Sequence, residues 1–209
     1  MAQFFSIHPE NPQPRLVQRA VEIVRAGGVI VYPTDSCYAL GCRIGDKTAM
    51  GRMRAIRNVD ERHHFALVCR DLAEIGTYAR VDNQQFRLLK SATPGSYTFI
   101  LRATRELPKR LLHPSRRTIG LRVPDHRVVQ ALLAELGEPL LSSTLTLPGD
   151  ELPLNDAQEI RDRLEHQVDL ILDCGSCGIT PTTVVDLTGE FPVITRQGKG
   201  GVAPFGLRA

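Results

Sequence analysis

Residues 28–42 read GVIVYPTDSCYALGC, and this stretch decides which fold the chain adopts. An apolar, largely β-branched run over residues 29–32 predicts a buried strand. Pro33 ends that strand, because proline has no N–H to donate to a neighbouring strand. The hydroxyls and carboxylate of Thr34-Asp35-Ser36 then fall at the strand's C-terminal end, where open α/β sheets bind small ligands. We therefore expect a site for a small polar molecule to begin here.

Around this stretch, helical and strand-like patterns alternate through the first two thirds of the chain. Residues 14–26 carry apolar side chains at helical spacing, and a second helix begins at the capping residue Asp46. The short strands expected at 184–187 and 193–195 are close enough in sequence to pair as a hairpin. Together these patterns predict the α/β class, as a single-domain twisted mixed sheet with flanking helices.

Length and composition limit the class of protein further. The chain has 209 residues, enough for one domain with a substantial core. Its 26 basic and 23 acidic residues leave a net charge of only +3, less than a strongly basic nucleic-acid-binding domain carries. Five cysteines, an odd number, suit a reducing compartment better than a disulfide framework. With no signal-peptide pattern and no apolar run of membrane-spanning length, we expect a cytoplasmic protein that binds no membrane.

We expect the domain to occupy residues 8–198. Residues 199–209 follow it and are rich in glycine near their start, with the sequence KGGVAPFGLRA. Such a composition predicts a flexible C-terminal tail.

Three later segments combine apolar strand character with polar side chains. Residues 139–144 (PLLSST) and 181–186 (PTTVVD) carry hydroxyls, and residues 118–124 (TIGLRVP) place Arg122 in an apolar strand. A buried guanidinium is costly unless it meets an anion or a carboxylate. Arg122 therefore binds either an anionic ligand or a structural partner, for which the candidates are Asp35, Asp125 and Asp186.

Taken in order, these segments resemble the YrdC-like family, the synthases of threonylcarbamoyl-adenylate used in tRNA modification. The matching motifs are Tyr32-Pro33-Thr34-Asp35, residues 38–42 (YALGC), 94–99 (PGSYTF), 119–124 (IGLRVP), 139–144 (PLLSST), 182–187 (TTVVDL) and 196–198 (RQG). Each motif is short, but the ordered set spans nearly the whole chain and looks most like the YciO-type branch. The resemblance implies a concave ligand or RNA face on the sheet.

The family joins ATP, bicarbonate and L-threonine to give threonylcarbamoyl-AMP and pyrophosphate. By resemblance, the amino-acid-binding positions are Thr34, Arg122, Ser142 and Thr182, and the nucleotide-binding positions are Arg57, Thr118, Thr144 and Arg196. An arginine suits a carboxylate through paired hydrogen bonds, whereas hydroxyls at strand ends often bond only the backbone. The resemblance implies ATP and a small amino acid as partners, with Mg²⁺ carried by the nucleotide and no protein-bound metal.

The chain departs from the family pattern at three places. The usual Lys-x-Arg after the second helix appears as Arg57-Asn58-Val59, the Ser-x-Asn appears as Thr144-Leu145-Thr146, and Val68 replaces a frequent histidine. Losing one phosphate-binding cation costs on the order of a hundredfold in rate. We therefore expect a nucleotidyltransferase activity that is weak or altered, unless Arg54 or Arg62 compensates.

A second hypothesis is a binding protein for double-stranded RNA or tRNA that performs no chemistry. Basic residues fall in two groups, Arg52, Arg54, Arg57, Arg62 and Arg70, and then Arg105, Lys109, Arg110, Arg116 and Arg117. If both groups border one concave face, they can hold RNA phosphates. Ordinary surface charge explains them equally well.

A third, minor hypothesis concerns Cys174 and Cys177, which form a C-x-x-C motif. Such a motif is typical of redox chemistry or of half a metal site, although buried or loop cysteines without a function also fit. No second cysteine or histidine pair lies at zinc spacing. The adjacent His63 and His64 are expected to point to opposite faces of a strand entry, which argues against a shared metal.

Overall fold

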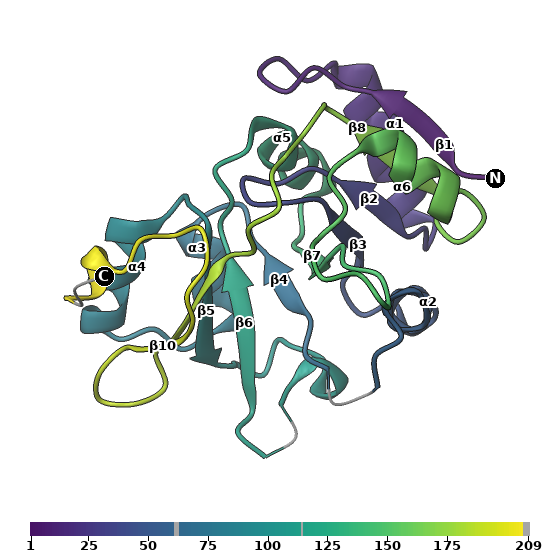
Figure 1. Cartoon of the computed structure of the whole chain (residues 1–209). Helices are drawn as coiled ribbons and strands as arrows, with labels where there is room; N and C mark the ends of the chain where they lie inside the picture. The colour runs from purple at the N-terminus through teal and green to yellow at the C-terminus, as the bar shows by residue number, and fades with distance from the viewer. Residues whose placement is uncertain (61–62, 114, 207–209) are drawn as a thin grey trace.

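The centre of the molecule is one open, twisted sheet with helices packed on its faces (Figure 1). The computed structural model describes residues 1–60, 63–113 and 115–206. Within them the strands are β1 (Gln3–Ser6), β2 (Ile30–Tyr32), β3 (Ala39–Arg43), β4 (Ala66–Val68), β5 (Tyr97–Arg102), β6 (Thr118–Arg122), β7 (Leu140–Thr144), β8 (Leu170–Asp173), β9 (Thr183–Asp186) and β10 (Val193–Arg196). The helices are α1 (Pro14–Arg25), α2 (Lys47–Arg57), α3 (Leu72–Tyr78), α4 (Asn83–Ala92), α5 (Arg127–Leu136) and α6 (Ala157–Leu164), with short 3-10 turns η1 (Lys109–Leu111) and η2 (Ala203–Phe205). No helix in these ranges is long and apolar enough to cross a membrane.

The strand order across the sheet is β1-β8-β2-β3-β7-β4-β6-β5-β9-β10. Some neighbours are parallel, such as β4 and β6, and others are antiparallel, such as β3 and β7. The predicted mixed α/β sheet in a single domain is therefore confirmed. The hairpin predicted near the C-terminus is also present, as the antiparallel pair β9 and β10.

The two faces of the sheet carry two apolar clusters, as the period-two alternation of strand side chains requires. In β2 and the residue before it, Val29 and Val31 join the cluster that contains α2 and α6, whereas Ile30 and Tyr32 join the one that contains α1 and α5. The α1–α5 cluster takes its strand residues from β2, β3, β4, β7 and β8. Its buried residues do not include any from β6, β5 or β9, so α1 and α5 leave this part of the face uncovered.

Segments near both ends of the described chain belong to the folded body. β1 pairs in parallel with β8 at one edge, so the folded body begins before residue 8. At the other end, Phe205 is buried and its ring lies 5.5 Å from that of Tyr97. The Thr183 hydroxyl also donates to the carbonyl of Gly200. Residues 199–206 thus contribute to the core, which differs from the tail that their composition suggested; residues 207–209 lie outside the described part.

Candidate functional site

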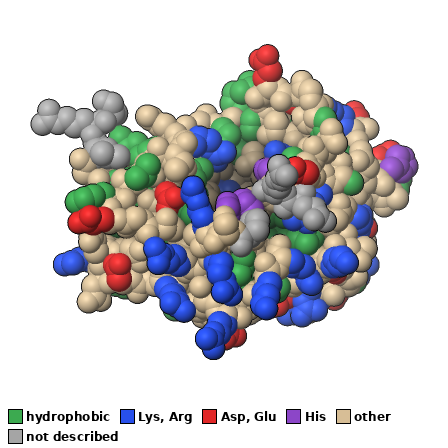
Figure 2. Space-filling view, turned by 90° about the horizontal axis from the view of Figure 1, so that it is seen from below, with side chains coloured by type: hydrophobic (Ala, Val, Ile, Leu, Met, Phe, Trp, Pro, Cys, Tyr) green, Lys and Arg blue, Asp and Glu red, His purple; other side chains and the backbone are tan. Residues whose placement is uncertain are grey.

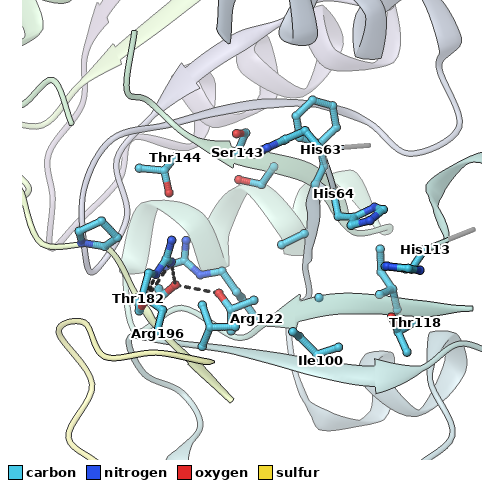
Figure 3. Close-up of a pocket in the computed structure, with 18 of the residues that line it drawn as sticks. His63, His64, Ile100, His113, Thr118, Arg122, Ser143, Thr144, Thr182 and Arg196 are labelled. Atoms are coloured by element: carbon cyan, nitrogen blue, oxygen red, sulfur yellow. Dashed lines mark hydrogen bonds between the residues drawn. The ribbon is translucent and has the colours of Figure 1, made fainter. Parts of the chain in front are cut away.

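A cavity of about 320 Å³ occupies the face of the sheet that α1 and α5 leave uncovered (Figure 3). Its floor consists of strand residues that register places side by side, namely Ala66, Gly120, Ile100, Thr98 and Val184. These residues share the face of Val68, because Val68 lies two positions from Ala66 on β4. The cavity reaches down to the backbone at Gly120, because this residue has no side chain; a Cβ there would lie 3.1 Å from the Thr98 methyl carbon.

Positive charge dominates the walls of this cavity. Four arginines are among the described lining residues, and no Asp or Glu is among them. They are Arg57, Arg116, Arg122 and Arg196. Such a lining favours a ligand with several negative charges, such as a polyphosphate, together with a carboxylate.

Arg122 is the most deeply buried of these cations, at 5% exposure. Its Nη2 donates to the Asp35 carboxylate at 2.9 Å and to the Ser36 hydroxyl at 3.2 Å. Asp35 also accepts from the Ser96 hydroxyl and from the backbone N–H of Asp125. Of the three candidate partners, Asp35 is therefore the one used. The Arg122 Nε is buried and has no hydrogen-bond partner in the described residues. Because Arg122 lines the cavity, its guanidinium can also meet a ligand there.

Thr182 and Arg196 meet at one end of the cavity (Figure 3). The Arg196 Nη2 donates to the Thr182 hydroxyl at 3.2 Å and to its carbonyl at 3.0 Å. The Thr182 hydroxyl also lies 2.8 Å from that of Thr98. Burial lowers the pKa of Arg196, and the charge of Arg122 lowers it further. The two guanidiniums repel each other across this end, which an anion between them would relieve.

Arg57, in the last turn of α2, also lines the cavity. Its Nη1 donates to the carbonyl of Thr144, and its Nε is buried without a partner in the described residues. Burial lowers the pKa of this guanidinium, because removal from water disfavours its charge. Ser142, which also lines the cavity, has its hydroxyl 2.6 Å from the phenol oxygen of Tyr32. Burial raises the pKa of Tyr32 to about 12, so that phenol stays protonated at neutral pH.

The structure adds three histidines to the cavity that the sequence analysis did not assign to it, namely His63, His64 and His113. The His64 and His113 rings lie 4.7 Å apart (Figure 3). The expectation that His63 and His64 point to opposite faces is wrong, since both side chains line the same cavity. Burial and the charge of Arg57 lower the pKa of His63. The only signal in the sequence was their position just before the strand that contains Ala66.

Seven of the eight predicted site residues line this one cavity: Arg122, Ser142, Thr182, Arg57, Thr118, Thr144 and Arg196. The eighth, Thr34, does not. Its hydroxyl donates to the carbonyl of Cys37 at 2.6 Å and accepts from the backbone N–H groups of Ser36 and Cys37, so it stabilises its own turn. Thr34 lines a separate hollow together with Asp35, Ser96, His126 and Cys177. The turn reaches the cavity through the contacts of Asp35 and Ser36 with Arg122 and through that of Cys37 with Thr144.

The first of the two basic groups does not form one surface. Arg52 pairs with Asp169 at 2.7 Å, Arg70 pairs with Asp71 at 3.1 Å, and Arg54 lies over the Phe65 ring. Only Arg57 of that group lines the cavity, and Arg62 lies outside the described residues. Sequence clustering failed here because residues on one helix point in different directions.

A part of the second basic group borders an arginine-rich groove that adjoins the cavity. The groove is lined by Arg80, Arg102, Arg105, Arg116 and Arg117, and it shares Arg116 and Thr118 with the cavity. Seen from below, Lys and Arg side chains gather along this side of the molecule, and histidines border a hollow near its centre (Figure 2). The described residues contain no group of three or more His, Cys, Asp or Glu side chains able to hold a metal ion.

Comparison with known proteins identifies the class to which this fold and cavity belong. Residues 22–198 match the family model Sua5_yciO_yrdC, described as telomere recombination. YciO, an uncharacterized protein of Escherichia coli (strain K12), is 60% identical over 205 residues, covering 98% of this chain and 100% of YciO. Its crystal structure superposes with a TM-score of 0.95 over 98% of this chain and 100% of the other. The chain belongs to the Sua5/YciO/YrdC family.

Within that family the chain lies in the YciO-type branch, and it is a more distant homologue of the synthases. A threonylcarbamoyl-AMP synthase of Chromobacterium violaceum is 33% identical over 180 residues, covering 86% of this chain and 92% of the enzyme. The crystal structure of P. abyssi Sua5 complexed with L-threonine has a TM-score of 0.85 at 21% identity, over 93% of this chain and 57% of that one. This last similarity concerns the fold alone.

Proposed function

We propose that the chain binds ATP and a small amino acid in this cavity and catalyses a weak or altered form of threonylcarbamoyl-AMP synthesis. One observation carries the proposal: seven residues from five separate segments of the chain, each placed in the site by resemblance, line a single cavity. The distant homology to threonylcarbamoyl-AMP synthases supports it.

The amino acid is proposed to bind at the end where Arg122, Ser142 and Thr182 lie. The guanidinium of Arg122, which lines the cavity, supplies a donor for the substrate carboxylate, and the Asp35 pair holds it in place. The hydroxyls of Ser142 and Thr182 can bond the amino group or a side-chain hydroxyl. The relative P. abyssi Sua5, whose structure holds L-threonine, supports threonine as the first amino acid to test.

ATP is proposed to place its phosphates between Arg57 and Arg196, with the hydroxyls of Thr118 and Thr144 beside them. Because the described lining lacks carboxylates, Mg²⁺ would enter with the phosphates as part of the substrate. The synthesis needs the amine of the amino acid to condense with bicarbonate, releasing water and giving a carbamate. A carbamate oxygen then attacks the α-phosphorus, and pyrophosphate leaves with the electron pair of the broken P–O bond.

Two features of the cavity account for an altered activity. Thr146 lines it where the family pattern has an asparagine, so an amide donor is missing beside the ligand. Val59 follows α2 where the pattern has a second cation, so Arg57 alone represents that motif. Each lost donor weakens stabilisation of the charge that develops on the phosphates.

The test is release of pyrophosphate from MgATP in the presence of bicarbonate and each amino acid in turn, with a threonylcarbamoyl-AMP synthase as the positive control. The proposal expects slow release that depends on both bicarbonate and one amino acid, and loss of that release in Arg122→Gln. No release with any amino acid, while the control enzyme turns over, would remove the synthase activity.

A second candidate function is binding of double-stranded RNA or tRNA. The observation that favours it is the arginine-rich groove, whose described lining holds five arginines and no acidic residue beside the cavity (Figure 2). Phosphate contacts of this kind release counterions, so the affinity should fall steeply as salt is added. An undetectable or salt-insensitive interaction contradicts this candidate.

The two candidates can be separated with two variants. Arg122→Gln should abolish amino-acid binding and leave RNA binding nearly unchanged, because Arg122 is buried in the cavity. The double variant Arg102→Gln/Arg105→Gln should weaken RNA binding and lower its salt dependence, because both residues line the groove and not the cavity. Equal effects of both variants on both ligands would mean that cavity and groove are one site.

A further inference from the structure

Cys174 and Cys177 form a pair that the proposed function does not use. Cys174 directly follows β8, and its Sγ lies 3.7 Å from the Sγ of Cys177 and 3.9 Å from the Nε2 of His126. Both thiols are partly exposed, and Cys177 lines the hollow that also contains Thr34 and Asp35. The chain therefore presents two free thiols in contact, next to an imidazole and open to small molecules.

The surroundings give the two thiols different reactivities. Contacts with Cys177 and His126 lower the pKa of Cys174, so it is the better source of thiolate. The proximity of Cys174 raises the pKa of Cys177, which keeps its proton. The phenol of Tyr38 also faces this pair, and it accepts from the backbone N–H of Cys174 and donates to the carbonyl of Gly175. Cys174 is therefore suited to be the nucleophilic thiolate, and Cys177 the resolving thiol.

The remaining three cysteines provide a contrast within the same chain. Cys37, Cys42 and Cys69 are buried. Burial raises the pKa of all three thiols, that of Cys42 to about 12. A disulfide reagent acting on the folded protein should therefore discriminate sharply between the C-x-x-C pair and these three.

The loop that contains Cys174 and Cys177 packs closely against Ser36, whose side chain contacts Arg122. Gly178 has a φ of +102°, and a Cβ there would lie 2.9 Å from the carbonyl oxygen of Ser36. Ser36 in turn accepts a hydrogen bond from Arg122. On its other side the loop is tied down by Asn155, whose side-chain oxygen accepts from the N–H groups of Cys177 and Gly178. A change in the Cys174–Cys177 loop therefore has a direct contact through which to reach residues 34–37.

We propose that Cys174 and Cys177 form a reversible dithiol–disulfide couple whose oxidation shifts the segment 34–37 that positions Arg122. The Cys174 thiolate attacks one sulfur of a small-molecule disulfide, which gives a mixed disulfide and releases one thiolate. Cys177 then loses its proton and attacks the Cys174 sulfur, forming the internal disulfide and releasing the second thiolate. The two protons pass to the released thiolates, so the protein is oxidised by two electrons and the small disulfide is reduced. The sulfurs must approach to about 2.05 Å, which moves the loop against Ser36.

The first experiment treats the full chain with oxidised glutathione, alkylates the remaining free thiols, and maps them by mass spectrometry. The expected product is an internal disulfide between Cys174 and Cys177, reversed by reduced glutathione, with Cys37, Cys42 and Cys69 alkylated only after unfolding. Stable glutathione adducts without the internal disulfide, or no reaction at Cys174, would overturn the proposal.

Matched variants assign the two roles. Cys177→Ser should accumulate one glutathione on Cys174, because the resolving thiol is gone. Cys174→Ser should react at least about tenfold more slowly, because the remaining thiol has the higher pKa. Equal rates in both variants would contradict the division of roles.

Amide hydrogen exchange of the oxidised and reduced protein tests the structural consequence without any assay of catalysis. Oxidation should change the exchange of residues 34–38 and leave that of α6 unaltered. Unchanged exchange at 34–38, with the disulfide demonstrably formed, contradicts the link to Arg122. These readouts stand whether or not the chain releases pyrophosphate.

Discussion

Arg122 and Asp35 form an ion pair at 2.9 Å in which both side chains are almost fully buried, at 6% and 7% exposure. The pair joins β6 to the turn after β2, two segments separated by 87 positions in the sequence. A buried pair adds little stability by itself, because desolvation offsets most of the attraction. Its structural effect is to fix one end of a guanidinium whose Nε remains unpartnered in the described residues.

Removing one member of this pair should destabilise the protein. In Arg122→Gln the Asp35 carboxylate stays buried without its cation, although Ser96 and Asp125 still donate to it. We expect a loss of about 3 kcal/mol in the free energy of unfolding, measured by urea denaturation. The double variant Arg122→Met/Asp35→Asn should regain more than half of that loss. A double variant as unstable as the single one would mean that the cost comes from packing and not from the uncompensated charge.

Gly120 should control the depth of the cavity. A side chain at this position points into the cavity above Ala66 and Thr98, so Gly120→Val should fold but bind ATP and amino acid at least about tenfold more weakly. Ligand-induced shifts in the melting temperature measure the effect. The matched glycine variant is Gly51→Ala in α2, where a Cβ meets no atom within 4 Å. It should leave binding unchanged and stabilise the fold by about 0.5–1 kcal/mol. Undiminished binding in Gly120→Val would place the ligand elsewhere.

The resemblance to the family selected the site residues, and strand periodicity explains why several of them meet. Because side chains alternate along a strand, Ser142 and Thr144 lie on one face of β7 and Leu141 lies on the other. By the same rule, Arg122 lies on the same face of β6 as Gly120. Seven of the eight residues chosen from the resemblance line one cavity. For Arg122, Ser142 and Thr144, alternation along the strand explains why the side chain lies on the cavity's face of the sheet.

The sequence could not predict features that depend on how loops approach one another. Thr34 follows a strand, as a ligand-binding residue often does, yet its hydroxyl donates to the carbonyl of Cys37 in its own turn. His63 and His64 reach the cavity because the chain before β4 does not continue the strand's alternation. The packing of Phe205 against Tyr97 could not be predicted either, because the glycine-rich composition of residues 199–206 gives no sign of this long-range contact.

Restoring the two missing donors should raise synthase activity. Val59→Arg returns a cation after α2, and Thr146→Asn returns an amide to the cavity wall. Each donor to a transition-state oxyanion contributes on the order of a hundredfold in rate when it is well placed, so the combined variant should release pyrophosphate at least about tenfold faster than the wild type. Lys47→Arg, a change of cation at the start of α2, serves as the control. No gain, with wild-type stability retained, would show that these two positions do not limit the reaction.

Binding of ATP should be accompanied by proton uptake at His63. Burial and the charge of Arg57 lower the pKa of His63 below its ordinary value of about 6.5. In the folded, ligand-free protein this ring therefore binds fewer protons than in the unfolded chain, and stability should fall as the pH drops below that value. Phosphates bound beside Arg57 offset its charge, which raises the pKa of His63 and draws in a proton.

Isothermal titration calorimetry at about pH 6, in two buffers with different heats of ionisation, measures this uptake. The wild type should take up a fraction of a proton per ATP, and His63→Gln should take up less, while His166→Gln should behave as the wild type because its ring is largely exposed after α6. Because a protonated His63 adds positive charge to the wall, ATP affinity should also rise as the pH falls from 7 to about 6. If proton uptake is identical in wild type and His63→Gln, the phosphates do not bind beside His63. The proposed nucleotide site would then lie closer to Arg196.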